Sequence, residues 1–212
     1  PDEGAPGPMH LKSRLFLPLL AAVSVAVVLA EIPSGTWAST GALSLASGVV
    51  ALVFMAMASL LGSRWNWLED VFGGLDRVYE VHKWLGVWAL ALASVHLVFK
   101  AGAPEWDVAS ILPLPPYWTR LVRQLSYVAL VVIVLLALNR KIPYGQWRWW
   151  HKLSGPLFVI VVLHWLSFKS PIALGSPAGL WLAACAALGL AGAAYKLLLY
   201  PFLARHAEYR LT

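Results

Sequence analysis

Long apolar runs separated by short polar connections dominate the chain. A helix needs about 20 apolar residues to cross a bilayer core of roughly 30 Å. We predict membrane-spanning helices at residues 15–32, 41–61, 81–99, 121–138, 149–168 and 178–200. The connections are short, so the expected fold class is an all-α membrane protein, a bundle of six transmembrane helices within residues 11–200. Residues 1–10 are rich in Pro and Gly and are expected to be mobile.

Composition and charge support a protein that lies in a lipid bilayer with both ends in the cytoplasm. Of its 212 residues, 60% are hydrophobic and 12% charged, and the mean hydropathy is +0.71. The predicted helices place only four of the 16 Lys and Arg residues on the side of the membrane opposite both termini, namely Lys100, Arg120, Arg123 and Lys169. Positively charged loops stay cytoplasmic, which predicts the N-in, C-in orientation. The net charge of +6 reflects this asymmetry, so we expect no nucleic-acid partner.

Two predicted helices each carry a pair of histidines. "HKWLGVWALALASVH" contains His82 and His96, and "HKLSGPLFVIVVLH" contains His151 and His164. Both helices run in the same direction across the membrane, so His82 lies level with His151, and His96 with His164. Ionisable groups inside a membrane are costly and usually functional. The sequence therefore predicts two facing histidine pairs at different depths.

Two stacked haems of the b type explain this pattern better than zinc does. The two pairs are separated by roughly 20 Å along the helix axis, at about 1.5 Å per residue, so they cannot share one ion. Zinc requires three or four ligands close together. A haem accepts one imidazole on each face, and bundle cores are common cofactor sites.

The spacing on the fifth helix requires a distortion. At about 100° per residue, the thirteen steps from His151 to His164 leave the two side chains about 140° apart on an ideal helix. Pro156 lies between them and follows Gly155. A proline inside a helix removes a backbone hydrogen bond, so we expect a kink or a local rewinding here.

The segments "FGGLDRVYEVHKWLG" and "YGQWRWWHKLSG", together with the four histidines, resemble the ferric reductase and NADPH oxidase superfamily, in particular its bacterial members. The resemblance implies two haems that pass electrons from a cytoplasmic flavin to an acceptor outside, such as oxygen or a ferric chelate. By this resemblance His82 and His151 would ligate the inner haem, and His96 and His164 the outer one. The expected location is a bacterial cytoplasmic membrane.

Enzymes of this superfamily continue into a dehydrogenase domain that binds FAD and NAD(P)H. Here residues 201–212, ending "RHAEYRLT", resemble the start of its linker, and the sequence contains no G-x-G-x-x-G fingerprint. We therefore expect either a truncated membrane domain of an NAD(P)H oxidase or ferric reductase, or a chain that depends on a separate reductase.

Further candidate residues follow from depth and charge. Arg77, Lys83, Arg148 and Lys152 are candidates for binding the propionates of the inner haem, or are ordinary cytoplasmic-side cations. Phe158 lies at a depth between the haems, although packing is the commoner role of such a ring. By the resemblance, Lys100 is a candidate catalytic residue beside the outer haem, one helical turn after His96, where it could also simply extend to the lipid headgroups.

Two alternatives stay open. One is a quinol-fed or reductase-fed haem b subunit, such as that of a methionine sulfoxide reductase system, in which we expect the first histidine of the third helix to be replaced. The other is a transporter that uses histidines as a proton relay. Such a relay usually includes membrane carboxylates, and only Glu31 borders a predicted span.

Overall fold

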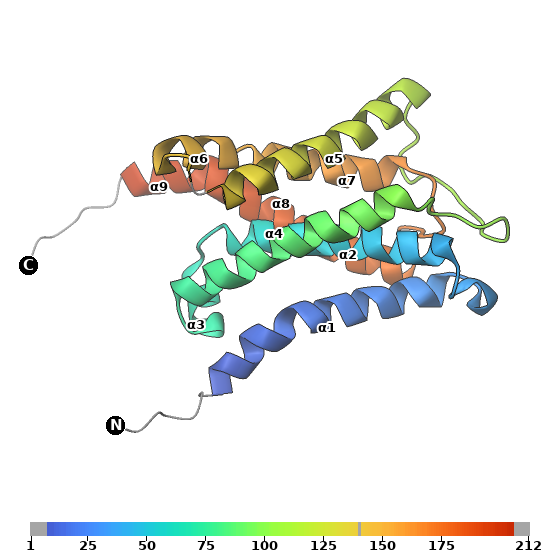
Figure 1. Ribbon diagram of the computed structural model, residues 1–212, viewed down its shortest axis with the longest axis horizontal. Coiled ribbons are helices and arrows are strands. Elements are labelled where there is room, and N and C mark those ends of the chain that lie inside the picture. Colours follow the sequence, from blue (N-terminus) through green and yellow to red (C-terminus); the bar gives the residue numbers. More distant parts are fainter. Residues whose placement is uncertain (1–7, 140, 206–212) are drawn as a thin grey trace, which may run out of the picture.

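The computed structural model describes residues 8–139 and 141–205, which form a bundle of helices (Figure 1). The helices along the described chain are α1 (Pro8–Glu31), the short η1 (Ser34–Thr36), α2 (Thr40–Leu61), α3 (Asn66–Phe72), α4 (Leu75–Val98), α5 (Pro116–Leu138), α6 (Tyr144–His151), α7 (Ser154–Ser167), α8 (Pro177–Ala194), the π-helical η2 (Tyr195–Leu199) and α9 (Tyr200–Arg205). The all-α fold class predicted from the sequence is confirmed.

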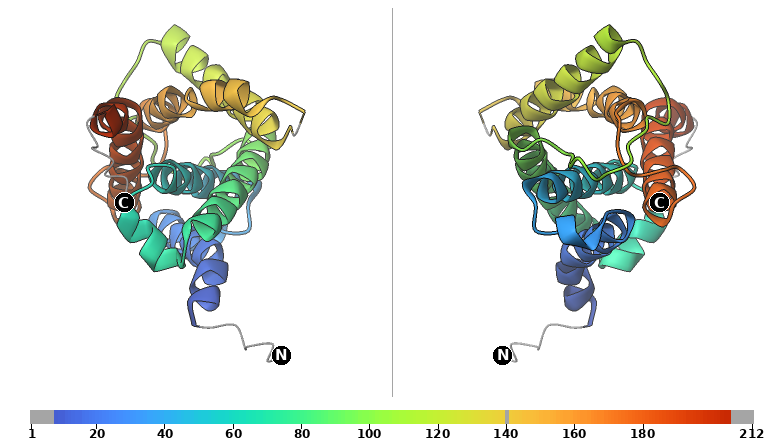
Figure 2. Two further views of the ribbon diagram at one scale, coloured as in Figure 1. Left: turned by 90° about the vertical axis from the view of Figure 1, so that its left-hand side faces the viewer. Right: turned by 90° about the vertical axis from the view of Figure 1, so that its right-hand side faces the viewer.

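Helix α2 is the central element of the bundle. It packs against α1, α4, α7 and α8, and Figure 2 shows it inside the ring that the other long helices form. In the most apolar window of α2, 67% of the residues are buried, against 17% in α4 and in α5. A helix that is apolar all round is expected to be buried. The outer faces of α4 and α5 are thus left for lipid.

Four described helices are long and apolar enough to cross a membrane: α2, α4, α5 and the continuous segment Pro177–Phe202. A shorter apolar helix occupies Leu15–Glu31 within α1. An integral membrane protein is thereby supported, whereas the count of six spans is not decided by helix length.

The predicted span at residues 149–168 is not one helix, which corrects the sequence interpretation. It is divided into α6 and α7 by a turn at Lys152 and Leu153. Pro156 is the third residue of α7, where its missing N–H costs little. In a continuous helix its ring would clash with the carbonyl of Lys152, four residues earlier. The expected distortion is therefore present, but as a break that precedes the proline.

The start of α1 and the end of α9 lie at the same end of the bundle, together with α3 and α6 (Figure 1). We call this the terminal end, and the end that holds η1 and residues 99–115 the loop end. The placement of the start of α1 and the end of α9 at one end of the bundle agrees with the predicted topology. That this end faces the cytoplasm stays a prediction. Residues 8–10 form the first turn of α1 and 201–205 lie in α9, whereas the remainder of the predicted segments 1–10 and 201–212 lies outside the described residues.

Helices α2 and α8 approach each other closely at two glycines. A Cβ atom on Gly189 would lie 2.8 Å from the Cα of Ala56, and one on Gly192 would lie 2.9 Å from the Cα of Leu60. The Ser59 hydroxyl donates a hydrogen bond of 2.7 Å to the Gly189 carbonyl across this contact. Small residues of this kind let helix backbones pack closely in membranes.

Replacement of Gly189 by alanine should therefore destabilise the bundle. The added methyl group meets backbone atoms of α2 that cannot rotate away, and overpacking of this kind costs about 1–3 kcal/mol. Thermal unfolding in detergent, followed by circular dichroism, measures the effect. The control is Gly145→Ala in α6, where nothing lies within 4 Å of the added atom. Equal unfolding temperatures for the two variants would contradict the close approach.

Candidate functional site

The structure brings together the two histidine pairs expected from the sequence. The ring centroids of His82 and His151 are 5.9 Å apart, and those of His96 and His164 are 6.3 Å apart. Helix α4 carries one member of each pair, while the partners come from the last residue of α6 and from α7. The break between α6 and α7 lets both of these partners face α4 despite their thirteen-residue spacing.

Backbone carbonyls of α2 orient both histidines of α4. The Nδ1 atom of His82 lies 2.8 Å from the Ala58 carbonyl oxygen, and that of His96 lies 2.8 Å from the Ser44 carbonyl oxygen. A carbonyl only accepts, so each Nδ1 carries the proton and donates it. The Nε2 atom of each ring is then left with a free lone pair, which is the form that ligates a metal.

A glycine makes room for the hydrogen bond of His96. Gly48 and Gly62 each lie four residues after the accepting carbonyl, and side chains on a helix tilt toward its N-terminus. A Cβ atom on Gly48 would lie 2.6 Å from Nδ1 of His96, whereas one on Gly62 would lie 3.7 Å from Cε1 of His82. The same carbonyl and glycine arrangement thus occurs twice along α2, fourteen residues apart, in register with the α4 histidines.

Ser44 also holds the end of α4 in place. Its side chain is fully buried, and its hydroxyl lies 2.7 Å from the Phe99 carbonyl oxygen and 3.1 Å from that of His96. Carbonyls in the last turn of a helix have no partner within that helix. Ser44 has one hydroxyl proton to donate, and its shorter contact is with the Phe99 carbonyl, so it links α2 to the chain beside His96.

The histidines on α6 and α7 are positioned differently, by aromatic rings. Their Nδ1 atoms are buried and make no hydrogen bond within the described structure. Trp147 stacks on His151 with ring centroids 5.1 Å apart and planes inclined by 15°, and Tyr144 stacks on Trp147 at 5.5 Å. Phe168 lies 5.5 Å from His164. Packing, and not hydrogen bonding, therefore orients these two imidazoles.

The ring separations fit a metal held between two imidazoles. A metal–nitrogen bond of about 2 Å, plus roughly 1 Å from the nitrogen to the ring centre, puts two such centres about 6 Å apart on opposite sides of one ion. Both observed separations are close to this value. Within residues 8–139 and 141–205, no group of three or more His, Cys, Asp or Glu side chains could hold a metal. Two opposed ligands suit an ion whose other ligands come from a macrocycle.

The other residues proposed from the sequence are less closely tied to the pairs. Arg77 is half-buried on α4, whereas Arg148 on α6 and Lys152 in the following turn are exposed. Lys83 is exposed, with its amino group over the ring of the neighbouring Trp84. These cations lie on elements at or near the terminal end, as predicted, and their binding of propionates stays a proposal.

Phe158 makes the packing contacts named as the commoner role of such a ring, whereas Lys100 has surroundings that differ from those expected. Phe158 is 2% exposed and packs where α7 meets Gly189 of α8, so its observed contacts are those of a core residue. Helix α4 ends at Val98, and Phe99 is extended, so Lys100 is an exposed loop residue and not one helical turn beyond His96. The binding of the Phe99 carbonyl by Ser44 holds the chain in this non-helical path.

Several residues of this site were missed by the sequence interpretation. Ser44, Gly48 and Trp147 all contact or support a histidine, and Arg123 of α5 lies close enough to His164 for its charge to act on that imidazole. A usable signal was present for Gly48, because Gly48 and Gly62 are fourteen residues apart, the same interval as His82 and His96.

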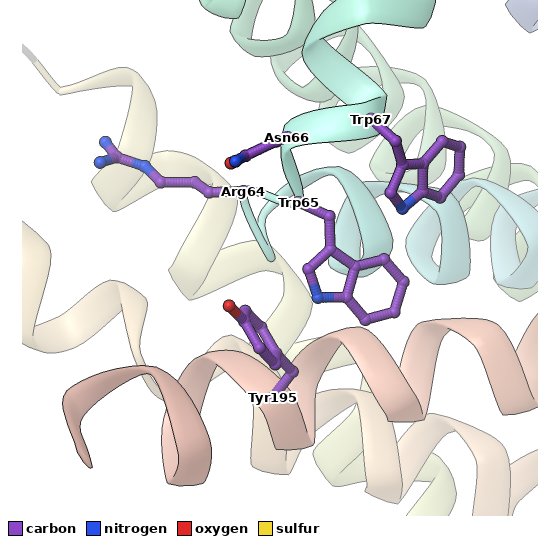
Figure 3. Close-up of a pocket in the computed structure, with 5 residues that line it drawn as sticks. All are labelled: Arg64, Trp65, Asn66, Trp67 and Tyr195. Carbon is purple, nitrogen blue, oxygen red and sulfur yellow. The ribbon is translucent and has the colours of Figure 1, made fainter. Parts of the chain in front are cut away.

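A separate pocket lies at the terminal end, and none of the four paired histidines lines it. Its volume is about 550 Å³, and its lining residues are Arg64, Trp65, Asn66, Trp67 and Tyr195. Figure 3 shows Tyr195 facing Trp65, with Arg64 and Trp67 extending in opposite directions. The Nε atom of Arg64 donates a hydrogen bond to the Tyr79 hydroxyl. None of the residues predicted for the site lines this pocket.

Replacement of Gly48 by alanine should displace His96 and weaken cofactor binding by the outer pair. The added Cβ atom overlaps the imidazole at 2.6 Å, so the bond from Nδ1 to the Ser44 carbonyl must break. If the two haems expected from the sequence are bound, their content per protein, measured by pyridine haemochrome, should fall from about two toward one. The matched control is Gly62→Ala, where the nearest contacts are ordinary and both haems should stay bound. Equal haem contents in the two variants would be inconsistent with this role of Gly48.

Comparison with known proteins agrees with this geometry. The family model described as "Ferric reductase like transmembrane component" matches residues 47–162, which is more than half of the chain. The match includes three of the four paired histidines, and His164 lies two residues beyond it. No curated protein matches the chain significantly. The chain belongs to the family of ferric reductase like transmembrane components.

Proposed function

We propose that this chain conducts electrons across a membrane through two haems of the b type, each held by one histidine pair. The observation that carries the proposal is the pair of imidazole separations, 5.9 and 6.3 Å, at two depths of one bundle. Family membership supports transmembrane electron transfer by an oxidoreductase-type membrane component. When bound, the haem irons would supply one-electron chemistry between the ferric and ferrous states.

The side chains have distinct roles in this proposal. His82 and His151 would hold the inner haem, and His96 and His164 the outer one. With two imidazoles offered to each haem, the chemistry supplied would be electron transfer and not the binding of oxygen at iron. Arg77, Arg148 and Lys152 would pair with propionates near the terminal end, and Arg123 would supply positive charge near His164.

The topology completes the pathway. We infer six spans, formed by α1, α2, α4, α5, the broken α6–α7 unit and the segment from α8 to α9, with the terminal end in the cytoplasm of a bacterial cell. Electrons would enter there from a dehydrogenase that binds FAD and NAD(P)H, either a domain of the same protein or a separate reductase. They would leave at the loop end to oxygen or a ferric chelate, and the exposed Lys100 lies at that end.

The structure also bears on the two alternatives. In a quinol-fed subunit of the methionine sulfoxide reductase type, the position of His82 is expected to differ, but here His82 has both an imidazole partner and an orienting carbonyl. A proton relay requires a chain of exchangeable groups, and the α4 histidines instead donate to backbone carbonyls, which cannot pass a proton onward. Electron transfer is therefore favoured.

Removal of one histidine should remove one haem. His96→Ala and His164→Ala should each lower the haem-to-protein ratio from about two toward one, because a single imidazole holds a haem poorly in a site built for two. His206→Ala, which lies outside the predicted spans, is the control and should retain both. Absorbance of the Soret band and pyridine haemochrome analysis give the ratio. Two haems in both variants would disprove the ligand assignment.

The proposed orientation is open to a separate measurement. A tag placed after Thr212 should resist protease added to intact cells and should be cleaved in inverted membrane vesicles, because the terminal end carries most of the positive charge. A tag on the loop between α4 and α5 should show the opposite pattern. Cleavage of the C-terminal tag in intact cells would reverse the direction of the proposed electron flow.

A further inference from the structure

The segment of residues 99–115, which joins α4 to α5, is fastened across the loop end of the bundle. Figure 2 shows it passing over this end between the two helices. It is hydrogen-bonded to four residues outside it and its flanking helices, Thr36, Ser44, Leu166 and Ser170. We call this segment the strap.

The first half of the strap is attached to the chain around the start of α2. The backbone of Gly102 comes so close to α2 that a Cβ atom on Gly41 would lie 2.5 Å from the Gly102 carbonyl oxygen. Trp106 is 6% exposed, and its indole Nε1 donates a hydrogen bond of 3.0 Å to the Thr36 hydroxyl. That hydroxyl in turn donates to the Pro33 carbonyl. A buried, hydrogen-bonded indole of this kind is a strong anchor, because it combines a large apolar area with a fixed polar group.

The second half is attached to α7 and to the chain that follows it. Ala109 and Ser170 exchange two backbone hydrogen bonds of 3.1 Å, and the Leu112 N–H donates to the Leu166 carbonyl at 2.7 Å. Leu166 is two residues beyond His164, and Phe168, in contact with His164, lies in the same stretch. The strap therefore joins the helix that carries His164 to the region beside His96, where Ser44 holds the Phe99 carbonyl.

We propose that the strap selects the electron acceptor by size: it admits dioxygen to the outer histidine pair and keeps ferric chelates away from it. This proposal rests on the proposed function. An acceptor that approaches from the loop end must pass a backbone held at four points, and opening it breaks several hydrogen bonds together. A diatomic molecule is small enough to reach the outer pair without this opening, whereas a ferric chelate, which is several times larger, requires it.

The reaction assigned to this site is a single electron transfer. One dioxygen accepts one electron and becomes one superoxide anion, while one ferrous haem becomes ferric; no bond is broken and no proton is taken up. The electron comes from the dehydrogenase in the cell, or from dithionite in the experiment below. Reduction of a ferric chelate by the same route would also use one electron, so the two acceptors differ in access and not in stoichiometry.

The test loosens the strap at Trp106 and measures reoxidation of the haems. Haem-loaded protein in nanodiscs is reduced with dithionite and mixed in a stopped-flow instrument with dioxygen or with Fe(III)-EDTA. Trp106→Ala should speed reoxidation by Fe(III)-EDTA several-fold and leave the rate with dioxygen within about twofold. The matched control is Trp118→Ala, an exposed tryptophan at the same end of the bundle, which should change neither rate. Access to the inner pair is the same in all variants, so the difference between them reports on the strap.

Trp106→Phe, which removes the indole hydrogen bond, and Thr36→Val, which also removes the bond from the Thr36 hydroxyl to the Pro33 carbonyl, are milder variants. They should act in the same direction if Trp106→Ala does not fold. Hydrogen exchange of the Ala109 and Leu112 amides shows independently whether the strap has opened. A strap that exchanges faster without any gain in the Fe(III)-EDTA rate would overturn the inference, as would an equal gain for dioxygen. Absence of two haems in the unmodified protein would instead refute the proposed function.

Discussion

The hydrogen bonds from the α4 histidines to two backbone carbonyls of α2 are the constraint on which the rest of the site depends. They fix the rotation of α4 against the central helix, and they also fix the tautomer of His82 and His96. At His96 the bond also depends on Gly48, because a Cβ atom there would lie 2.6 Å from Nδ1 of the imidazole. The absence of a side chain at Gly48 thus decides where the His96 imidazole points.

The partners of these histidines meet a different geometric demand. A spacing of thirteen residues does not return a side chain to the same face of a continuous helix. His151 and His164 could therefore not both face α4 if they belonged to one continuous helix. Pro156 contributes to the solution because its ring disfavours a continuous helix through Lys152. The turn between α6 and α7 then changes the direction in which the side chains of α7 point relative to those of α6. The irregular backbone lies within the bundle region, where it is tolerated if neighbouring elements satisfy it.

The sequence alone was enough to predict the helical class, the apolar segments and the pairing of the histidines by depth. Those features depend on local composition and on spacing, which a single chain displays directly. The α2 glycines were missed because a glycine in an apolar helix has many possible reasons, and only the neighbouring helix shows which one applies. Lys100 was misplaced for a related reason: the end of α4 is set by Ser44, some fifty residues away in the chain. The strap likewise depends on pairings between segments, such as Trp106 with Thr36, that no local pattern records.

In each of the two proposed haem sites the two histidines are held in different ways, and the same difference occurs at both sites. The ligands therefore offer little reason for the two haems to differ in reduction potential. At each depth the α4 histidine donates from Nδ1 to a carbonyl, which makes its other nitrogen a stronger ligand, while the α6 or α7 histidine is held by aromatic packing and has no such bond in the described structure. The ligand sets are therefore nearly equivalent.

Any difference in reduction potential that directs electrons outward must come instead from the surroundings of each pair. Those surroundings do differ: exposed cations such as Arg148 and Lys152 lie near the inner pair, and Arg123 and the covering strap lie near the outer one. The direction of electron flow would then be set by charge and solvent access around the sites, because the coordination itself is repeated.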